Sequence, residues 1–165
     1  MDANIHDPEF GPPVDESGFR FRRARVGHQA GARNLGASVF ELEPGDSQFP
    51  YHYHYASEEL LIVLDGEPEL RDPDGWRKLR PGEVVSFPAG EAGGHQVANR
   101  SDASVRIMLV IEMNLPHVVV LPDSGKVSSF TGPPDAEGTF WHTSSMEDGV
   151  AYMDGESPPG DPGPR

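Results

Sequence analysis

Two histidines and a glutamate in the middle of the chain have the spacing of a metal site. One residue separates His52 from His54, and Glu59 follows five positions later, at the start of the apolar run LLIVL. Successive side chains on a β-strand point to opposite faces, so both imidazoles are expected on one face. Two neutral nitrogen ligands and a carboxylate suit a divalent first-row metal. The alternative is a surface loop that happens to contain histidines, and one His-x-His pair alone would favour that alternative.

A second segment offers a third imidazole. Residues 82–99 read GEVVSFPAGEAGGHQVAN, in which Pro88 and Gly90 predict a turn between two strands and His95 begins the second strand. Taken alone, a histidine after a Gly-Gly pair is more often structural or exposed than a ligand. Taken with the first segment, His95 is a candidate to join the same site.

Length and composition predict one packed domain with loose ends. The chain has 165 residues, of which 36% are hydrophobic, and its 19 glycines and 17 prolines mark turns in the middle but crowd near both ends. We predict a loosely ordered N-terminal arm over residues 1–33, a packed domain over residues 34–121 and a C-terminal extension over residues 122–165. The end of that extension is rich in Gly, Pro and acidic residues, which is typical of disorder.

The charge and the absence of cysteine exclude several classes of function. A net charge of −14 repels nucleic acid and anionic lipid. The basic stretch FRFRRAR has acidic flanks and is interpreted as a solvated strand face or an inter-subunit contact. Without cysteine there are no disulfides and no thiolate ligands. No signal-like or membrane-length apolar run is present, so we expect a cytoplasmic protein that binds neither nucleic acid nor membrane.

Short strands separated by glycine turns predict an all-β fold. No segment keeps a helical period over eleven or more positions, and turn residues recur at roughly 8–12-residue intervals, which indicates a β-sandwich or barrel. Asp65-Gly66 predicts a hairpin between LLIVL and residues 67–75. The runs LLIVL and VRIMLVIEM are apolar on both faces, so one face is expected to line the interior and the other to meet a second layer or another subunit. The expected strands are residues 19–26, 34–43, 60–64, 76–79, 84–87, 95–99, 105–113 and 117–121.

The two segments resemble the sequence motifs of the cupin superfamily. The first family motif is G-x5-H-x-H-x3,4-E-x6-G, and the second is G-x5-P-x-G-x2-H-x3-N. The chain departs from the first motif because Gly45 lies one residue further upstream, and from the second because four residues instead of two separate Gly90 from His95. The matched positions are His52, His54, Glu59 and Gly66 in the first motif, and Gly82, Pro88, Gly90, His95 and Asn99 in the second.

The resemblance implies a fold and a cofactor. The fold would be a double-stranded β-helix, or jelly-roll barrel, and the protein would be a homodimer. One divalent transition metal per chain (Mn, Fe, Ni, Zn or Cu) would be held by His52, His54, Glu59 and His95. Four protein ligands leave one or two positions of a five- or six-coordinate metal open for a substrate or dioxygen.

Weaker candidates surround these four residues. Glu58 is a rival carboxylate, but the alternation of a strand would turn it away from the imidazoles. Asn99 is expected to orient a turn near the site, while Phe87 and Met113 are more typical of core filling than of substrate contact. His28, His117 and His142 have no partner at ligand spacing and are interpreted as satisfied or exposed histidines. The pocket and outer-contact candidates are Gln48, Tyr51, Glu58, Phe87, Asn99 and Met113.

Three functions follow from this interpretation. The first is a metal-dependent enzyme acting on a small organic acid, diketone or sugar, of dioxygenase, decarboxylase or isomerase type. The second is a non-catalytic metal or small-ligand binding protein, such as a sensor or storage protein. The third is a barrel in which the metal is only a structural clip, held by four protein ligands in a closed tetrahedron. Fold alone does not choose among them.

Overall fold

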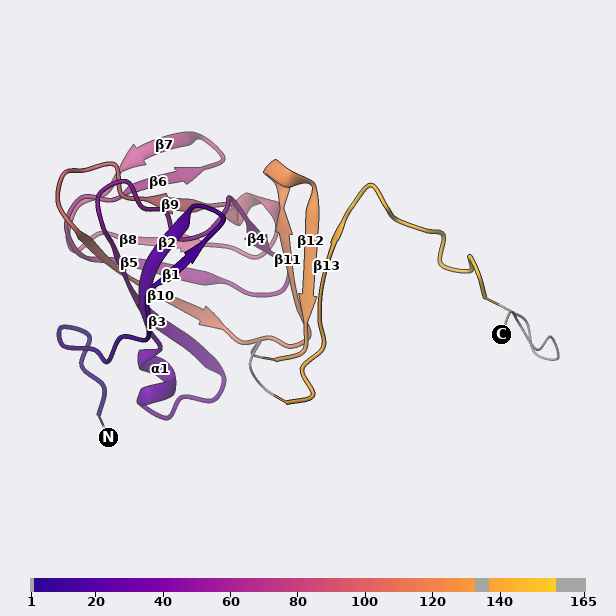
Figure 1. Cartoon of the computed structure of the whole chain (residues 1–165), viewed down its shortest axis with the longest axis horizontal. Coiled ribbons are helices and arrows are strands. Elements are labelled where there is room, and N and C mark those ends of the chain that lie inside the picture. The colour runs from indigo at the N-terminus through magenta and orange to yellow at the C-terminus, as the bar shows by residue number, and fades with distance from the viewer. Residues whose placement is uncertain (1, 133–136, 157–165) are drawn as a thin grey trace.

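The computed structural model describes residues 2–132 and 137–156, and nearly all of its regular structure is β (Figure 1). The only α-helix in the described part of the chain, α1 (Val26–Gln29), is a single turn, and no described helix is long and apolar enough to cross a membrane. Two 3-10 turns, η1 (Glu91–Gly93) and η2 (Pro122–Ser124), complete the helical structure. The strands are β1 (Val14–Glu16), β2 (Phe19–Ala24), β3 (Leu35–Leu42), β4 (Tyr53–His54), β5 (Glu59–Asp65), β6 (Glu69–Asp72), β7 (Gly75–Lys78), β8 (Val84–Phe87), β9 (Gln96–Ala98), β10 (Val105–Glu112), β11 (His117–Leu121), β12 (Lys126–Phe130) and β13 (Trp141–Ser145).

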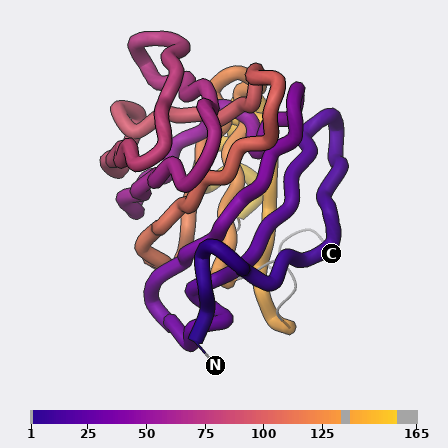
Figure 2. Tube along the Cα trace, turned by 90° about the vertical axis from the view of Figure 1, so that its left-hand side faces the viewer, coloured from indigo at the N-terminus to yellow at the C-terminus, as the bar shows by residue number. Residues whose placement is uncertain are grey.

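The strands form three antiparallel sheets. The largest has the order β1-β2-β3-β10-β5-β8, the second has the order β13-β12-β11-β4, and the smallest has the order β7-β6-β9. The N-terminal strands in indigo and the β6–β7 segment in magenta lie on opposite sides of the molecule in Figure 2. Within residues 2–132 and 137–156, the sheets do not join into a closed barrel. The predicted all-β jelly-roll fold is confirmed, as a sandwich with open edges.

The main core lies between the six-stranded and three-stranded sheets. Alternate residues of β10 are buried, starting with Val105, Ile107 and Leu109, as expected for a strand with one face in the interior. Leu70 of β6 and Val97 of β9 approach them from the opposite sheet. The candidate site residues described below pack against this core.

The outer face of the largest sheet is covered by the chain's own N-terminal segment. Ile5, Phe10 and Val26 pack with Val39 of β3 and Met108 of β10 in a second apolar cluster. The apolar runs in β5 and β10 predicted that both faces of the sheet would be covered. The N-terminal segment covers the outer face. Within the stretch predicted as an arm, β1, β2 and α1 are therefore regular and packed.

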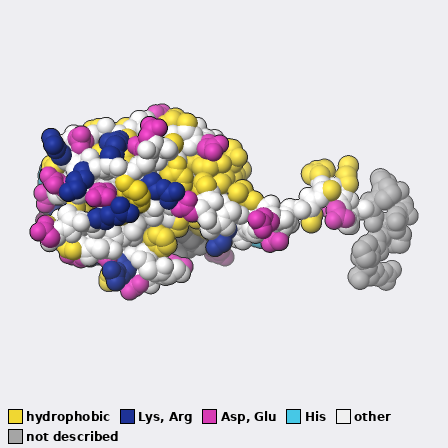
Figure 3. Space-filling model, turned by 90° about the horizontal axis from the view of Figure 1, so that it is seen from above, with side chains coloured by type: hydrophobic (Ala, Val, Ile, Leu, Met, Phe, Trp, Pro, Cys, Tyr) yellow, Lys and Arg dark blue, Asp and Glu magenta, His cyan; other side chains and the backbone are white. Residues whose placement is uncertain are grey.

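Part of the predicted C-terminal extension is also regular. Strand β12 pairs with β11 and β13 pairs with β12, and together they complete the sheet that contains β4. Beyond β13 the chain leaves the body, where Tyr152 is 93% exposed (Figure 1). Figure 3 shows apolar side chains gathered on the side of the body next to this departing segment. Residues 157–165, for which disorder was predicted, lie outside the described residues.

The predicted Asp65-Gly66 hairpin is wrong. Strand β5 pairs with β8 and β10, whereas β6 pairs with β7 and β9. Gly66 is instead a corner at which the chain passes from the largest sheet to the smallest. Its φ of 77° and its close approach to Val105 explain why glycine stands there.

Gly66→Ala is expected to destabilise the fold more than Gly82→Ala. Both glycines have a positive φ, of 77° and 86°, so each substitution strains the backbone by about 1–2 kcal/mol. A Cβ at Gly66 would also lie 2.7 Å from Val105 Cγ1 and 2.9 Å from Ser104 O, whereas a Cβ at Gly82 meets nothing within 4 Å. The overlap adds at least about 1 kcal/mol. Urea unfolding of both variants measures the difference, and equal losses would contradict the packing argument.

Candidate metal centre

Backbone hydrogen bonds bring the two histidine segments together. His52 N donates to His95 O at 3.0 Å, and His95 N donates to His52 O at 2.9 Å. This reciprocal pair places the two residues directly opposite each other, with ring centroids 4.6 Å apart. A further bond, from Gly90 N to His54 O at 2.7 Å, fixes the loop before η1 against β4. The fold thus brings His95 next to two imidazoles that lie more than forty residues before it in the sequence.

Two of the imidazoles are oriented by backbone carbonyls. His52 Nδ1 lies 2.9 Å from Pro50 O, and His95 Nδ1 lies 2.9 Å from Gly93 O. A carbonyl can only accept, so each Nδ1 must carry the hydrogen and each Nε2 is left with a free lone pair. This is the arrangement in which a metal-binding histidine is held by a neighbouring acceptor. Phe87 fixes the His95 ring further by stacking on it at 3.8 Å.

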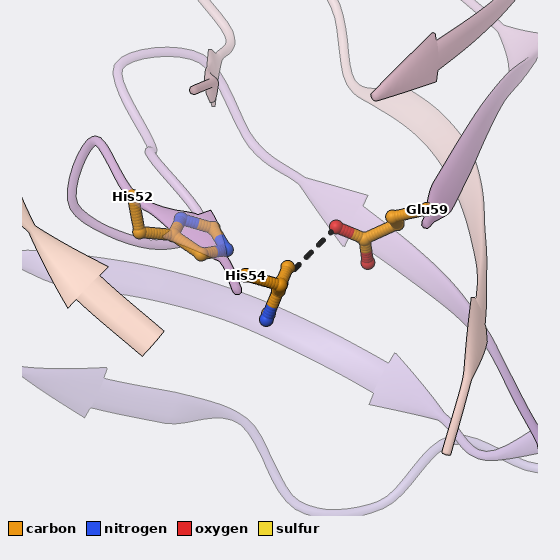
Figure 4. A group of neighbouring side chains, drawn as sticks. All are labelled: His52, His54 and Glu59. Atoms are coloured by element: carbon orange, nitrogen blue, oxygen red, sulfur yellow. Dashed lines mark ion pairs between the residues drawn. The ribbon is translucent and has the colours of Figure 1, made fainter. Parts of the chain in front are cut away.

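Glu59 supplies the carboxylate from the first position of β5. Its side chain is buried, and Oε2 lies 3.0 Å from His95 Nε2 and 3.5 Å from His54 Nε2. One ligand atom from each of His52, His54 and Glu59 lies within 4.8 Å of the other two, a group that could hold a metal ion (Figure 4). These three ligand atoms therefore face one point, and His95, just before β9, lies beside Glu59.

Unsatisfied atoms at this point fit a cation. Glu59 Oε2 and His95 Nε2 are both buried and form no hydrogen bond within the described residues, although they are close neighbours, because their geometry is not that of a hydrogen bond. Leaving a buried carboxylate oxygen unpaired is costly. A divalent ion coordinated by both atoms would satisfy the oxygen and the nitrogen together.

The local environment keeps the acid charged and one imidazole neutral. Burial acts to raise the pKa of Glu59, but the facing imidazoles of His54 and His95 outweigh it and hold that pKa below its ordinary value. Burial, together with the neighbouring His95 and His54, lowers the pKa of His52 to about 3. Both shifts favour the forms that bind a metal, a carboxylate and a neutral imidazole.

A family comparison identifies the domain that carries this site. The family model described as the cupin domain matches residues 38–112, a range that contains all four residues. The chain carries a cupin domain. The predicted resemblance is therefore confirmed at the level of the family.

Solved structures share the fold of this cupin. A sugar phosphate isomerase of the cupin superfamily from Silicibacter pomeroyi is 24% identical, with a TM-score of 0.74 over 93% of this chain and 98% of the other. A protein named as a sugar phosphate isomerase from Acidithiobacillus ferrooxidans is 24% identical, with a TM-score of 0.73 over 87% and 88%. The polyketide cyclase RemF from Streptomyces resistomycificus is also 24% identical, with a TM-score of 0.58 over 71% and 82%. A comparison with curated protein sequences finds no match.

The sequence did not place His117 in the site of this cupin. Its Nε2 lies 2.7 Å from His54 Nδ1, and the side chain is only 2% exposed. Burial lowers the pKa of His117 to about 4, and the adjacent His54 contributes to the shift. His117 is 63 positions from His54, and only the pairing of β11 with β4 brings them together. No spacing signal in the sequence could have found this contact.

The structure separates the weaker candidates by location. Glu58 is exposed and accepts a hydrogen bond from Ser86 Oγ at 2.7 Å, away from the imidazoles. Asn99 is fully buried and donates to Leu42 O and Ala103 O, so it orients a turn as expected. Met113 lies against Gly36 between β3 and the end of β10. The exposed side chains of His28 and His142 take no part in the site.

Gln48 and Tyr51 line a neighbouring cavity. This cavity, of about 560 Å³, lies between the β1–β2 hairpin and the segment before β4, and none of the four ligand candidates lines it. Tyr51 lies under Arg71, whose guanidinium carbon is 4.3 Å from the ring centroid. Burial raises the pKa of Tyr51, so its hydroxyl stays protonated at neutral pH. Phe49 lies between this cavity and the candidate metal centre, because it lines the cavity and packs edge-on against His52, with ring centroids 6.0 Å apart.

The metal-free protein is expected to lose stability as the pH falls below 6.5. The unfolded chain binds protons at His52 and His117 near their ordinary pKa of 6.5, whereas the folded chain binds them only near 3 and 4. Each buried neutral histidine therefore lowers the free energy of unfolding by up to about 1.4 kcal/mol per pH unit below that value. Urea unfolding in EDTA at pH 7, 6 and 5 measures this slope.

His52→Gln is the informative variant in that experiment, and His28→Gln is its matched control at an exposed position. The first substitution should make the pH slope shallower because one titrating group is gone. The second should leave the slope as it is in the wild type. Identical slopes in all three proteins would show that His52 is not held neutral by the fold.

Proposed function

We propose that this cupin binds one divalent transition metal through His52, His54, Glu59 and His95. The observation that supports the proposal best is the pair of buried, unsatisfied atoms Glu59 Oε2 and His95 Nε2, 3.0 Å apart and facing His54 Nε2. The backbone carbonyls at Pro50 and Gly93 leave the Nε2 atoms of two histidines free to coordinate. Three nitrogens and one oxygen accept Mn, Fe, Ni, Zn or Cu, so metal supply selects among them.

The proposed activity is that of a metal-dependent enzyme on a small organic acid, diketone or sugar. A bound metal would supply Lewis acidity toward a carbonyl or carboxylate oxygen. Glu59 would stay ionised and bring one negative charge to the centre, while His52 stays neutral. Isomerisation, decarboxylation and dioxygenation remain the proposed reaction types, and the names of the fold neighbours make sugars and polyketide-like diketones the first substrates to test.

A second function is favoured by one observation. The four donor residues are buried or half-buried, and the neighbouring 560 Å³ cavity is lined by none of them. A metal enclosed in this way could be a binding or structural centre without substrate access. The number of exchangeable waters on the metal distinguishes the two functions, because only an open coordination position can hold one.

Glu59→Gln is expected to lower metal affinity strongly, and Glu58→Gln is its matched control. The first variant removes the anionic ligand, so its affinity for Zn²⁺ should fall by about 10-fold or more. The second lies next to it in sequence but is exposed and bonded to Ser86, so its affinity should match the wild type. Competition with a chromophoric chelator measures both. Equal affinity in all three proteins would remove Glu59 from the metal site.

The Mn²⁺-loaded protein is expected to hold at least one exchangeable water. Field-dependent proton relaxation measures that water directly, and oxygen uptake, decarboxylation and aldose–ketose assays with the same protein then test turnover. An enhanced relaxivity together with turnover of one substrate class supports the enzyme. Tight metal binding without inner-sphere water would instead identify a closed, non-catalytic centre.

Two further expectations stay predictions. We propose a homodimer, for which the exposed side chains of Tyr55, Leu115, Phe140 and Trp141 offer apolar surface in and beside the four-stranded sheet. We also propose a cytoplasmic location and, because the net charge of −14 repels nucleic acid and anionic lipid, no nucleic-acid or membrane partner.

A further inference from the structure

One metal-ligand candidate is oriented differently from the other two. Backbone carbonyls hold Nδ1 of His52 and of His95, whereas the atom facing His54 Nδ1 is the Nε2 of another imidazole, His117, at 2.7 Å. The ring planes of this pair are nearly perpendicular, at 85°, with centroids 4.8 Å apart. The contact is a hydrogen bond between two imidazole nitrogens, so one must donate and the other accept.

We propose that His117 is the positioning residue for His54, and that the C-terminal strands therefore help to orient a ligand of the metal centre. This inference rests on the proposed metal binding. If His54 Nε2 coordinates the metal, His54 Nδ1 carries the hydrogen and donates it to His117 Nε2. His117 must then carry its own hydrogen on Nδ1. That bond fixes the tautomer of His54 and the direction of its lone pair.

The C-terminal sheet holds His117 in place by a ladder of rings. His117 in β11, Phe130 in β12 and Trp141 in β13 are direct partners across the three strands. The His117 and Phe130 rings stack at 4.9 Å and 7°, and the Phe130 and Trp141 rings stack at 4.3 Å and 7°. Cross-strand ring pairs stabilise a sheet and restrict each ring. The ladder leaves His117 little freedom to turn away from His54.

The same sheet also holds the backbone of His54. In the register of β4 and β11, His54 is paired with Val119 and Tyr53 with Val120, and Tyr55 N donates to Val118 O at 3.0 Å. His117 lies two residues from Val119 and so shares its face of the strand. Backbone and side chain of His54 are thus both fixed by β11. The other ligand candidates instead rely on β5, β8 and the His52–His95 bridge.

The His117→Phe variant removes the hydrogen bond to His54 but keeps the ring packing. Phenylalanine keeps an aromatic ring that can stack on Phe130 but offers no acceptor to His54. Loss of such an orienting partner costs 10–100-fold in metal affinity, so the dissociation constant for Zn²⁺ should rise by about that factor. His117→Gln can place an amide oxygen near the position of Nε2 and should recover most of the affinity. His142→Gln, at an exposed position on β13, is the control and should bind like the wild type.

The Co²⁺-loaded proteins give a readout that a merely structural role would not move. The visible d–d bands report the ligand geometry at the metal and should shift in His117→Phe but not in His142→Gln. Circular dichroism and the urea midpoint of each variant establish that the fold is retained. Unchanged Zn²⁺ affinity and unchanged Co²⁺ bands in a folded His117→Phe protein would overturn the proposal.

The wild-type protein provides a test that does not depend on folding of any variant. In ¹⁵N-labelled, Zn²⁺-loaded protein, imidazole NMR should find the hydrogen of His54 on Nδ1, that of His117 on Nδ1, and a coupling between His54 Nδ1 and His117 Nε2. A hydrogen on His117 Nε2 would refute the proposed direction of the bond. Failure of the wild type to bind Zn²⁺ or Co²⁺ at all would instead contradict the proposed function, so the two failures are distinguishable.

Discussion

A buried carboxylate that faces imidazoles is the constraint on which this structure depends. Removing the charge of Glu59 from water costs several kcal/mol unless another charge or a set of donors replaces the water. The surrounding imidazoles can offset the buried charge in two ways, either by becoming protonated or by coordinating a cation together with Glu59. Burial opposes the first way at His52, since it holds the pKa of that ring near 3. The proposed cation is the way consistent with a neutral His52 ring, and it would satisfy Glu59 Oε2, which has no hydrogen bond among the described residues.

The rest of the fold holds Glu59 and the surrounding imidazoles in place. Glu59 begins β5, a central strand between β8 and β10, so its backbone is fixed on both sides. His52 and His95 are held by a reciprocal pair of backbone bonds between segments outside the named strands. The apolar core lies beneath them, and Phe87 of β8 stacks on His95. A rigid scaffold of this kind can hold ligands at a fixed separation before any ion binds, which reduces the ordering cost of binding.

The ends of the chain have specific places in this arrangement. The N-terminal segment covers the outer face of the largest sheet and supplies a second apolar cluster. The C-terminal strands build the sheet on which β4 rests and bring His117 to His54. Each end would look dispensable from its Gly, Pro and acidic content. Their contacts show instead that one end stabilises the core and the other orients a ligand candidate.

The sequence by itself determined the local parts of this protein. Turn residues and strand alternation predicted an all-β fold and placed His52, His54 and Glu59 together, because these signals act over a few positions. The resemblance to the cupin motifs added the jelly-roll fold and His95 as a fourth candidate. The alternation of β5 also placed Glu58 away from Glu59. Only the tertiary structure decided what depends on pairing between distant strands. It showed that Gly66 is a corner between sheets, that Ile5, Phe10 and Val26 belong to a covering layer, and that His117 meets His54 across β11 and β4. Hydrophobic pattern fixes which face of a strand is buried, but it does not fix which strand lies beside it, and that choice created the contact that the sequence could not reveal.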